Sequence, residues 1–165
     1  MNLLYAEAGV KRKDTALTIG LRALMIIGVL VGLFLMFIGQ LFSIIGLVLI
    51  VAVFFFYPKL DVEYEYVYVD GQIDFDRITG KSKRKTLLRV DFEQVEIMAP
   101  STSHALDNYK NAQFEVKNFT SLNKDNKHYT VIANIDNKRM KVLFEPSEKM
   151  LDLIKKKSPR KLETY

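Results

Sequence analysis

The chain has 165 residues, hydrophobic residues make up 49% of it, and its formal net charge is +5. It contains no cysteine, which excludes structural disulfides and thiolate metal sites. The length allows one small domain and an additional segment.

Residues 17–57 form the most apolar part of the chain and contain a single charged residue, Arg22. A signal peptide would have an apolar core of only about 7–15 residues. One helix over the whole region would measure about 60 Å at about 1.5 Å per residue, twice the hydrocarbon thickness of about 30 Å. We therefore predict two transmembrane helices, at about 20–38 and 41–57, joined by a tight turn at Gly39-Gln40.

Basic residues flank this apolar region and are absent from the predicted turn. Four precede or begin the first helix and one follows the second: Lys11, Arg12, Lys13, Arg22 and Lys59. The positive-inside rule then places both ends of the region in the cytoplasm. We expect an integral protein of the cell membrane with both termini cytoplasmic, in which residues 1–16 form a cytoplasmic N-terminal segment.

Two features inside the apolar region could serve packing or function. Gly28 and Gly32 are four residues apart, a spacing that lets another helix approach closely. The partner could be a helix of another protein, but packing against Gly46 within the same helical pair is the favoured interpretation. Arg22 is near a helix end, so we expect it to extend to the lipid headgroups.

Period-2 alternation of apolar and polar residues dominates the remainder of the chain and predicts β-strands. Tyr64, Tyr66 and Tyr68 fall on one face of the first strand, where the core is expected. Asp70-Gly71 and Asp136-Asn137 are typical of tight turns. The pattern slips near Glu93-Gln94, which predicts a bulge or a corner between sheets. Seven strands are predicted at residues 64–69, 72–76, 88–92, 95–97, 114–119, 128–134 and 139–144.

An amphipathic helix is predicted after Pro146. Ser147 can cap it, and Met150, Leu151 and Ile154 form one apolar stripe. Ser158-Pro159 ends the helix, and residues 159–165 are expected to be a basic tail. The predicted fold class is a membrane α-helical hairpin followed, at residues 59–158, by a mostly-β domain: a seven-stranded antiparallel barrel capped by the C-terminal helix.

Three segments carry a resemblance to a known family: "EYEYVYVDGQIDFDRI", "KSKRKTLLRVDFEQVEIMAP" and "FEPSEKMLDLIKK". They resemble a functionally uncharacterised family of bacterial membrane proteins with two N-terminal transmembrane helices and a cytoplasmic domain like the pleckstrin-homology (PH) domain. The resemblance covers nearly the whole chain and implies this architecture and a bacterial origin. It implies no specific chemistry.

The main candidate site is a basic run that follows the second predicted strand and contains Lys81, Lys83, Arg84 and Lys85. In PH domains that bind phosphoinositides, the cations usually lie between the first two strands, where this chain has Asp70-Gly71. A phosphoinositide site is therefore not expected. Because the first strand leads about 26 Å away from the membrane and the second returns, the run should contact anionic lipid headgroups. A solvated turn is the alternative.

Other chemistries have little support in the sequence. The two histidines and the serines at 101 and 103 have no evident partners for nucleophilic catalysis. Asp74 and Asp76 could share a divalent cation, but a polar outer strand face explains them better. We expect no enzyme activity, no cofactor or metal, and no nucleic-acid binding, because no recognition motif is evident.

Three functions stay open at this point. The first is a membrane-anchored adaptor that binds an unknown protein partner at the cytoplasmic face of a bacterial membrane. The second is a protein that senses or binds anionic lipid. The third is an accessory subunit of a larger membrane complex, which the protein would join through Gly28 and Gly32.

Overall fold

The computed structural model describes residues 4–163, and the chain divides into two compact units. One unit contains residues 13–62 and 79–83 and is called the helical unit below. The other contains, among the described residues, 4–12, 63–78 and 84–163 and is called the sheet unit. Each unit is considered by itself.

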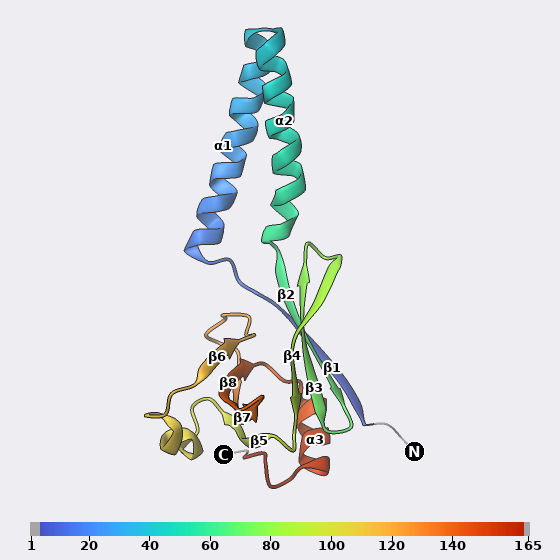
Figure 1. The fold of residues 1–165 in the computed structure, drawn as a ribbon, viewed down its shortest axis with the longest axis vertical. Helices are drawn as coiled ribbons and strands as arrows, with labels where there is room; N and C mark the ends of the chain where they lie inside the picture. The colour runs from blue at the N-terminus through green and yellow to red at the C-terminus, as the bar shows by residue number, and fades with distance from the viewer. Residues whose placement is uncertain (1–3, 164–165) are drawn as a thin grey trace. The chain divides into compact units, whose positions relative to one another are not determined.

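The helical unit is built from two antiparallel helices, α1 (Ala16–Ile38) and α2 (Gln40–Phe56), which lie side by side (Figure 1). Thr15 caps α1, because its hydroxyl accepts a hydrogen bond from the Thr18 N–H. A short 3₁₀ helix, η1 (Tyr57–Leu60), follows α2. The two predicted helices are confirmed, and both are long and apolar enough to cross a membrane.

Glycines bring the two helices together. A Cβ atom on Gly32 would lie 2.9 Å from the Gly46 carbonyl oxygen, and one on Gly28 would lie 3.5 Å from Leu49. The favoured interpretation is therefore confirmed, since both predicted helix-packing glycines face α2 within the same pair. In the alternative, a helix of another protein would have to replace α2, which already covers Gly32.

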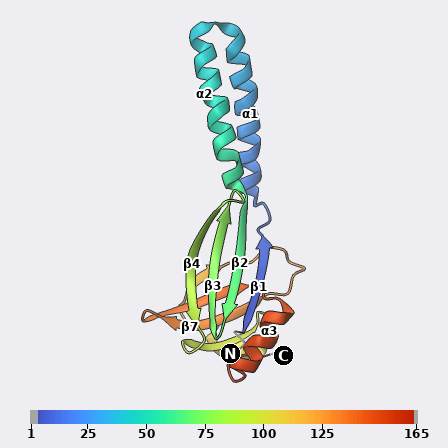
Figure 2. The same cartoon turned by 90° about the vertical axis from the view of Figure 1, so that its right-hand side faces the viewer.

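Eight strands form two four-stranded sheets in residues 4–163. Sheet A has the order β1-β2-β3-β4, with β1 at Tyr5–Lys11, β2 at Val62–Val69, β3 at Gln72–Thr79 and β4 at Lys83–Asp91 (Figure 2). Sheet B has the order β5-β7-β8-β6, with β5 at Val95–Pro100, β6 at Glu115–Asn118, β7 at Tyr129–Ile135 and β8 at Lys138–Phe144.

All seven predicted strands are confirmed, but the predicted closed antiparallel barrel is wrong. The strands separate into two sheets, and β6 pairs with β8 in parallel. Alternation in the sequence shows which side chains face a core, but it does not show which strands become neighbours. The predicted slip at Glu93-Gln94 is confirmed as the corner at which the chain leaves sheet A and enters sheet B.

Strand β1 was not predicted, and it lies in the segment expected to be outside the domain. It pairs antiparallel with β2 from Tyr5↔Val69 to Lys11↔Glu63. The buried face of β1 is made by small residues, of which Ala6 is fully buried. Alanine and glycine are weak strand formers, so the alternation in "YAEAGVK" is a faint signal. Residues 1–3 of the expected segment lie outside the described residues.

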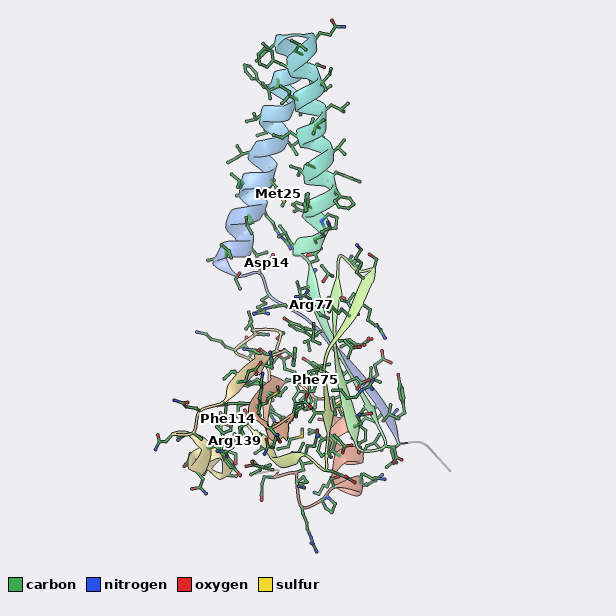
Figure 3. All side chains as sticks on the ribbon, in the orientation of Figure 1. Asp14, Met25, Phe75, Arg77, Phe114 and Arg139 are labelled. Atoms are coloured by element: carbon green, nitrogen blue, oxygen red, sulfur yellow. The ribbon has the colours of Figure 1, made fainter. Side chains whose placement is uncertain are left out.

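Aromatic rings fill the space between the two sheets. Tyr66 and Phe75 of sheet A each contact Phe144 of sheet B edge to face, with ring centroids 5.3 Å apart. Phe119 stacks on Phe75 at 4.8 Å, and its carbonyl accepts a hydrogen bond of 2.5 Å from the Tyr66 hydroxyl. The tyrosine face predicted to be core is confirmed, since Tyr64, Tyr66 and Tyr68 are all buried. Figure 3 shows Phe75 within this interior.

Helix α3 (Glu148–Lys157) covers part of the core through Met150 and Ile154, which are fully buried. Ser147 caps it as predicted. The described part of the predicted basic tail is hydrogen-bonded to β5. The backbone N–H of Met98 in β5 donates to the Lys161 carbonyl, and Glu163 donates back to the Met98 carbonyl. The tail therefore covers the edge of β5; residues 164–165 lie outside the described residues.

The glycine contact gives a testable consequence. In Gly46→Ala, the new methyl group would meet the Gly32 carbonyl of α1, so we expect a lower midpoint of thermal unfolding in detergent. Gly20→Ala is the matched control, because a Cβ there meets nothing within 4 Å. The control should gain about 1 kcal/mol of helix propensity and be no less stable than the native chain. Equal behaviour of the two variants would contradict the contact.

Candidate functional site

The turn between β3 and β4 carries the first part of the predicted basic run. Gly80 and Lys81 both adopt left-handed backbone conformations, with φ of 60° and 58°. The Gly80 N–H donates a 3.0 Å hydrogen bond to the Asp61 carbonyl, and a Cβ on Gly80 would lie 3.3 Å from the Pro58 carbonyl oxygen. The turn is thus fixed against the segment that follows α2, inside the helical unit.

The structure divides the four predicted cations into two groups. Lys81 and Lys83 belong to the helical unit, whereas Arg84 and Lys85 belong to the sheet unit. Arg84 forms an ion pair with Glu65 of β2 and lies 3.8 Å from Asp76 of β3. The contact of all four side chains with lipid headgroups stays a prediction, although Arg84 also pairs within sheet A.

Arg22 joins the two ends of the helical pair. Its guanidinium lies 3.0 Å from Asp14, which precedes α1, and 2.8 Å from Asp61, which follows η1. It also lies 5.7 Å from the ring centre of Tyr57. Side chains on a helix lean toward its N-terminus, so Arg22 reaches these partners from the second turn of α1. The direction of the Arg22 side chain fits the predicted extension toward the headgroups. Its guanidinium, however, forms ion pairs with two carboxylates of the same chain.

Lys59 extends over aromatic rings at the same end of the helices. Its ammonium lies 3.9 Å from the ring centre of Phe55 and 4.3 Å from that of Phe56. Such contacts are favourable and hold the ammonium close to the apolar surface of α2. Aromatic and basic residues at a helix end are typical of a membrane interface.

The outer face of sheet A contains a cluster of carboxylates around Arg84. Burial raises the pKa of Glu65 above its ordinary value, and a hydrogen bond shared with Glu7 of β1 raises it further. Hydrogen bonds from Tyr5 and Glu65 lower the pKa of Glu7. The positive charge of Arg84, which forms an ion pair with Glu65, opposes this rise in the pKa of Glu65.

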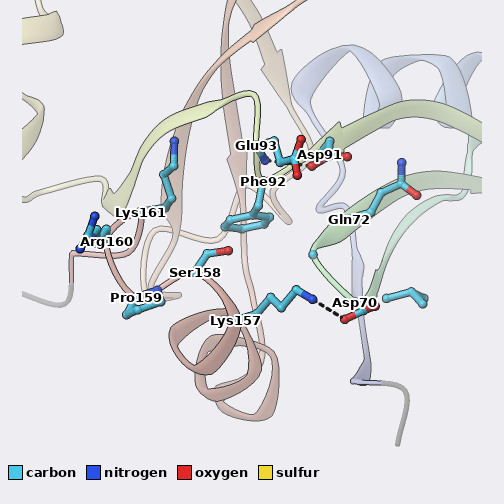
Figure 4. Close-up of a pocket in the computed structure, with 12 residues that line it drawn as sticks. Asp70, Gln72, Asp91, Phe92, Glu93, Lys157, Ser158, Pro159, Arg160 and Lys161 are labelled. Carbon is cyan, nitrogen blue, oxygen red and sulfur yellow. Dashed lines mark hydrogen bonds and ion pairs between the residues drawn. The ribbon is translucent and has the colours of Figure 1, made fainter. Parts of the chain in front are cut away.

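A groove of about 630 Å³ opens on the sheet unit where three segments meet (Figure 4). The turn between β2 and β3 contributes Asp70, the corner after β4 contributes Asp91 and Glu93, and the end of α3 with the following residues contributes Lys157 and Arg160. The Lys157 ammonium donates to Asp70 at 2.9 Å. The groove therefore presents acidic and basic groups on facing walls.

The candidate catalytic and metal-binding side chains are engaged elsewhere. Ser101 is hydrogen-bonded to Thr130 at 2.7 Å. Asp74 accepts two hydrogen bonds from Arg89, and Asp76 accepts one from Thr86. Within residues 4–163, no group of three or more His, Cys, Asp or Glu side chains could hold a metal ion.

A second small core covers the outer face of sheet B. The 3₁₀ helix η2 (His104–Tyr109) places Leu106 against Ile132 of β7 and Ala99 of β5. Nearby, the guanidinium of Arg139 lies 4.9 Å from the ring centre of Phe114 (Figure 3). The apolar residues of the loop after β5 therefore have a packing role.

Two sheets with an aromatic core and a C-terminal helix over it define a PH-like domain, here combined with two apolar helices. A model of the family described as bacterial PH-like domain (DUF6106) matches residues 2–164, and the chain belongs to that family. The predicted resemblance is thereby confirmed. No curated protein and no solved structure matches the chain.

Sequence reasoning missed the groove and the Arg22 ion pairs. Lys157 and Asp70 are 87 positions apart, and no pattern in the sequence connects the end of α3 with the turn after β2. Asp14 lies two residues before α1, and Asp61 directly follows η1. One acid at each end of the apolar region was the available signal for a shared cation. The positive-inside rule uses only the basic residues at these ends.

The raised pKa of Glu65 predicts a pH dependence of stability. Because the folded-state pKa of Glu65 is raised, its contribution is fully present below the ordinary value of 4.5 and is lost as the pH rises through the folded-state pKa. In Glu65→Gln, the unfolding midpoint should no longer fall with rising pH above 4.5. Glu63→Gln, two residues earlier on the same face, is the control and should keep the native slope. An unchanged slope in Glu65→Gln would refute the assignment.

Proposed function

We propose that the protein is a membrane-anchored interaction module whose PH-like domain binds a protein partner at the cytoplasmic face of a bacterial membrane. One observation carries the proposal: α1 and α2 are inserted between neighbouring strands of one sheet. The chain leaves sheet A at Lys11 and re-enters it at Val62. If the helices span the membrane, sheet A is tethered to the same membrane face by two chain segments.

The double tether favours a scaffold over a mobile domain. Only residues 12–15 separate β1 from α1, and only η1 and Asp61 separate α2 from β2. Links this short leave little freedom for a domain to travel to a distant target. A module of this kind would hold its partner close to the lipid surface.

The groove on the sheet unit is the best candidate for the partner surface. It lies within the sheet unit, beside Asp70 at the end of β2. Its volume is in the range of about 300–1,000 Å³ found for binding pockets. Acidic and basic walls suit a short polypeptide segment that carries charges of both signs.

The proposal gives no role to catalysis, and the accessory-subunit alternative is weakened. In the part of the chain that the structure describes, the candidate nucleophile Ser101 is bonded to a threonine and not to a base. The close-approach surface at Gly32, which the accessory-subunit alternative requires, is covered by α2.

Site-specific photo-crosslinking in native membranes tests the proposal. A photoreactive residue at Gln72, in the groove, should repeatedly crosslink one soluble protein. The same residue at Lys127, on an exposed loop outside the groove, should not. Adding Arg160→Glu should abolish the product by reversing the charge of one wall, whereas Lys124→Glu, with the same charge change outside the groove, should leave it intact. Crosslinks to lipid alone, or equal crosslinking from both positions, would contradict the proposal.

A further inference from the structure

All charged residues of the helical unit lie at one end of it. From residue 23 to residue 58 the chain has no charged side chain. The charged residues are instead near the start of α1, directly after α2, and in the turn after β3: Lys13, Asp14, Arg22, Lys59, Asp61, Lys81 and Lys83. These are five cations and two acids, so this end carries a net charge of +3.

The ion pairs of the two acids do not involve Lys59, Lys81 or Lys83. Asp14 and Asp61 both lie within 3.0 Å of Arg22, which is therefore shared between two carboxylates. Lys59 lies over two phenylalanine rings. Within residues 4–163, the side chains of Lys81 and Lys83 have no hydrogen-bond or ion-pair partner, and both are exposed. Three ammonium groups are thus available to an external anion.

The position of Lys81 and Lys83 is fixed by the fold. The turn is anchored by the hydrogen bond from Gly80 to Asp61 and by its contact with Pro58. Because Pro58 and Asp61 flank Lys59, the anchor brings the turn lysines to the segment where the chain leaves α2. An arrangement set by backbone contacts costs less conformational entropy on binding than a flexible loop would.

We infer that Lys59, Lys81 and Lys83 form a binding site for the headgroups of anionic phospholipids. The apolar helices end at this level, with Phe55, Phe56 and Tyr57 as interfacial rings, so a headgroup phosphate is the anion that the site meets. The site differs from the one expected for phosphoinositides in PH domains, because the equivalent turn here is Asp70-Gly71. The inference rests on the proposed membrane anchoring but not on the proposed protein partner.

The test uses the full-length protein in detergent micelles titrated with phosphatidylglycerol, with native mass spectrometry to count bound lipids. We expect Lys81→Ser/Lys83→Ser to weaken phosphatidylglycerol binding by about 5-fold per removed ammonium, or roughly 25-fold for the pair. Binding of zwitterionic phosphatidylcholine should not change. Lys124→Ser/Lys127→Ser, which removes two exposed lysines of the sheet unit, should bind phosphatidylglycerol like the native chain.

A second variant separates charge from position. Gly80→Val keeps every lysine, but a branched side chain is strained at φ of 60° and meets the Pro58 carbonyl, so it should release the turn. We expect its affinity for phosphatidylglycerol to fall as well, while native affinity in this variant would overturn the fixed arrangement.

Two further outcomes would overturn the inference. One is equal phosphatidylglycerol affinity in Lys81→Ser/Lys83→Ser and its control. The other is displacement of the lipid by millimolar inorganic phosphate, which would identify a site for soluble phosphate. Loss of the protein crosslink from Gln72 with lipid binding intact would count against the proposed function alone.

Discussion

The antiparallel pairing of β1 with β2 is the constraint on which the rest of the structure depends. These strands are 50 residues apart in sequence, and the two apolar helices form the connection between them. Seven residue pairs hold the strands in register, and Arg12 adds a 2.6 Å hydrogen bond to the Tyr64 hydroxyl where β1 ends. Because neighbouring strands of one sheet lie on one side of any membrane, a helical pair that spans a membrane between them has to enter and leave it on that side.

The start of α1 and the segment after α2 are held together by a second, shorter-range interaction. Arg22 is shared by Asp14 and Asp61, and its Nε atom is buried without a hydrogen-bond partner in residues 4–163. Removing either carboxylate would leave a partly buried charge less well compensated, which is costly. The backbone carbonyl of Asp61 also anchors Gly80. One aspartate therefore connects the helical pair to the turn that carries Lys81 and Lys83.

Much of the fold follows from local patterns, and the failures concern long-range contacts. Alternation located all seven predicted strands and the buried tyrosines, and the pairs Asp-Gly and Asp-Asn located two turns. Each of these features depends on residues that are close together in the sequence. The closed barrel was wrong because strand order depends on pairing across the chain, as in β6 with β8. For the candidate site, the sequence located Lys81 and Lys83. It could not show that Arg84 forms an ion pair with Glu65, or that the end of α3 meets the turn at Asp70 and forms a groove there.

The most direct test of the account is the membrane sidedness of single cysteines, which the cysteine-free chain makes unambiguous. Cysteines placed at Lys11 in β1, at Gln40 at the start of α2 and at Lys127 in the sheet unit would be treated with a membrane-impermeant maleimide. The account predicts that intact cells label only the Gln40 position, and that Lys11 and Lys127 become reactive together once the membrane is permeabilised. Labelling of Lys11 and Lys127 from opposite sides, or of either one in intact cells, would contradict it.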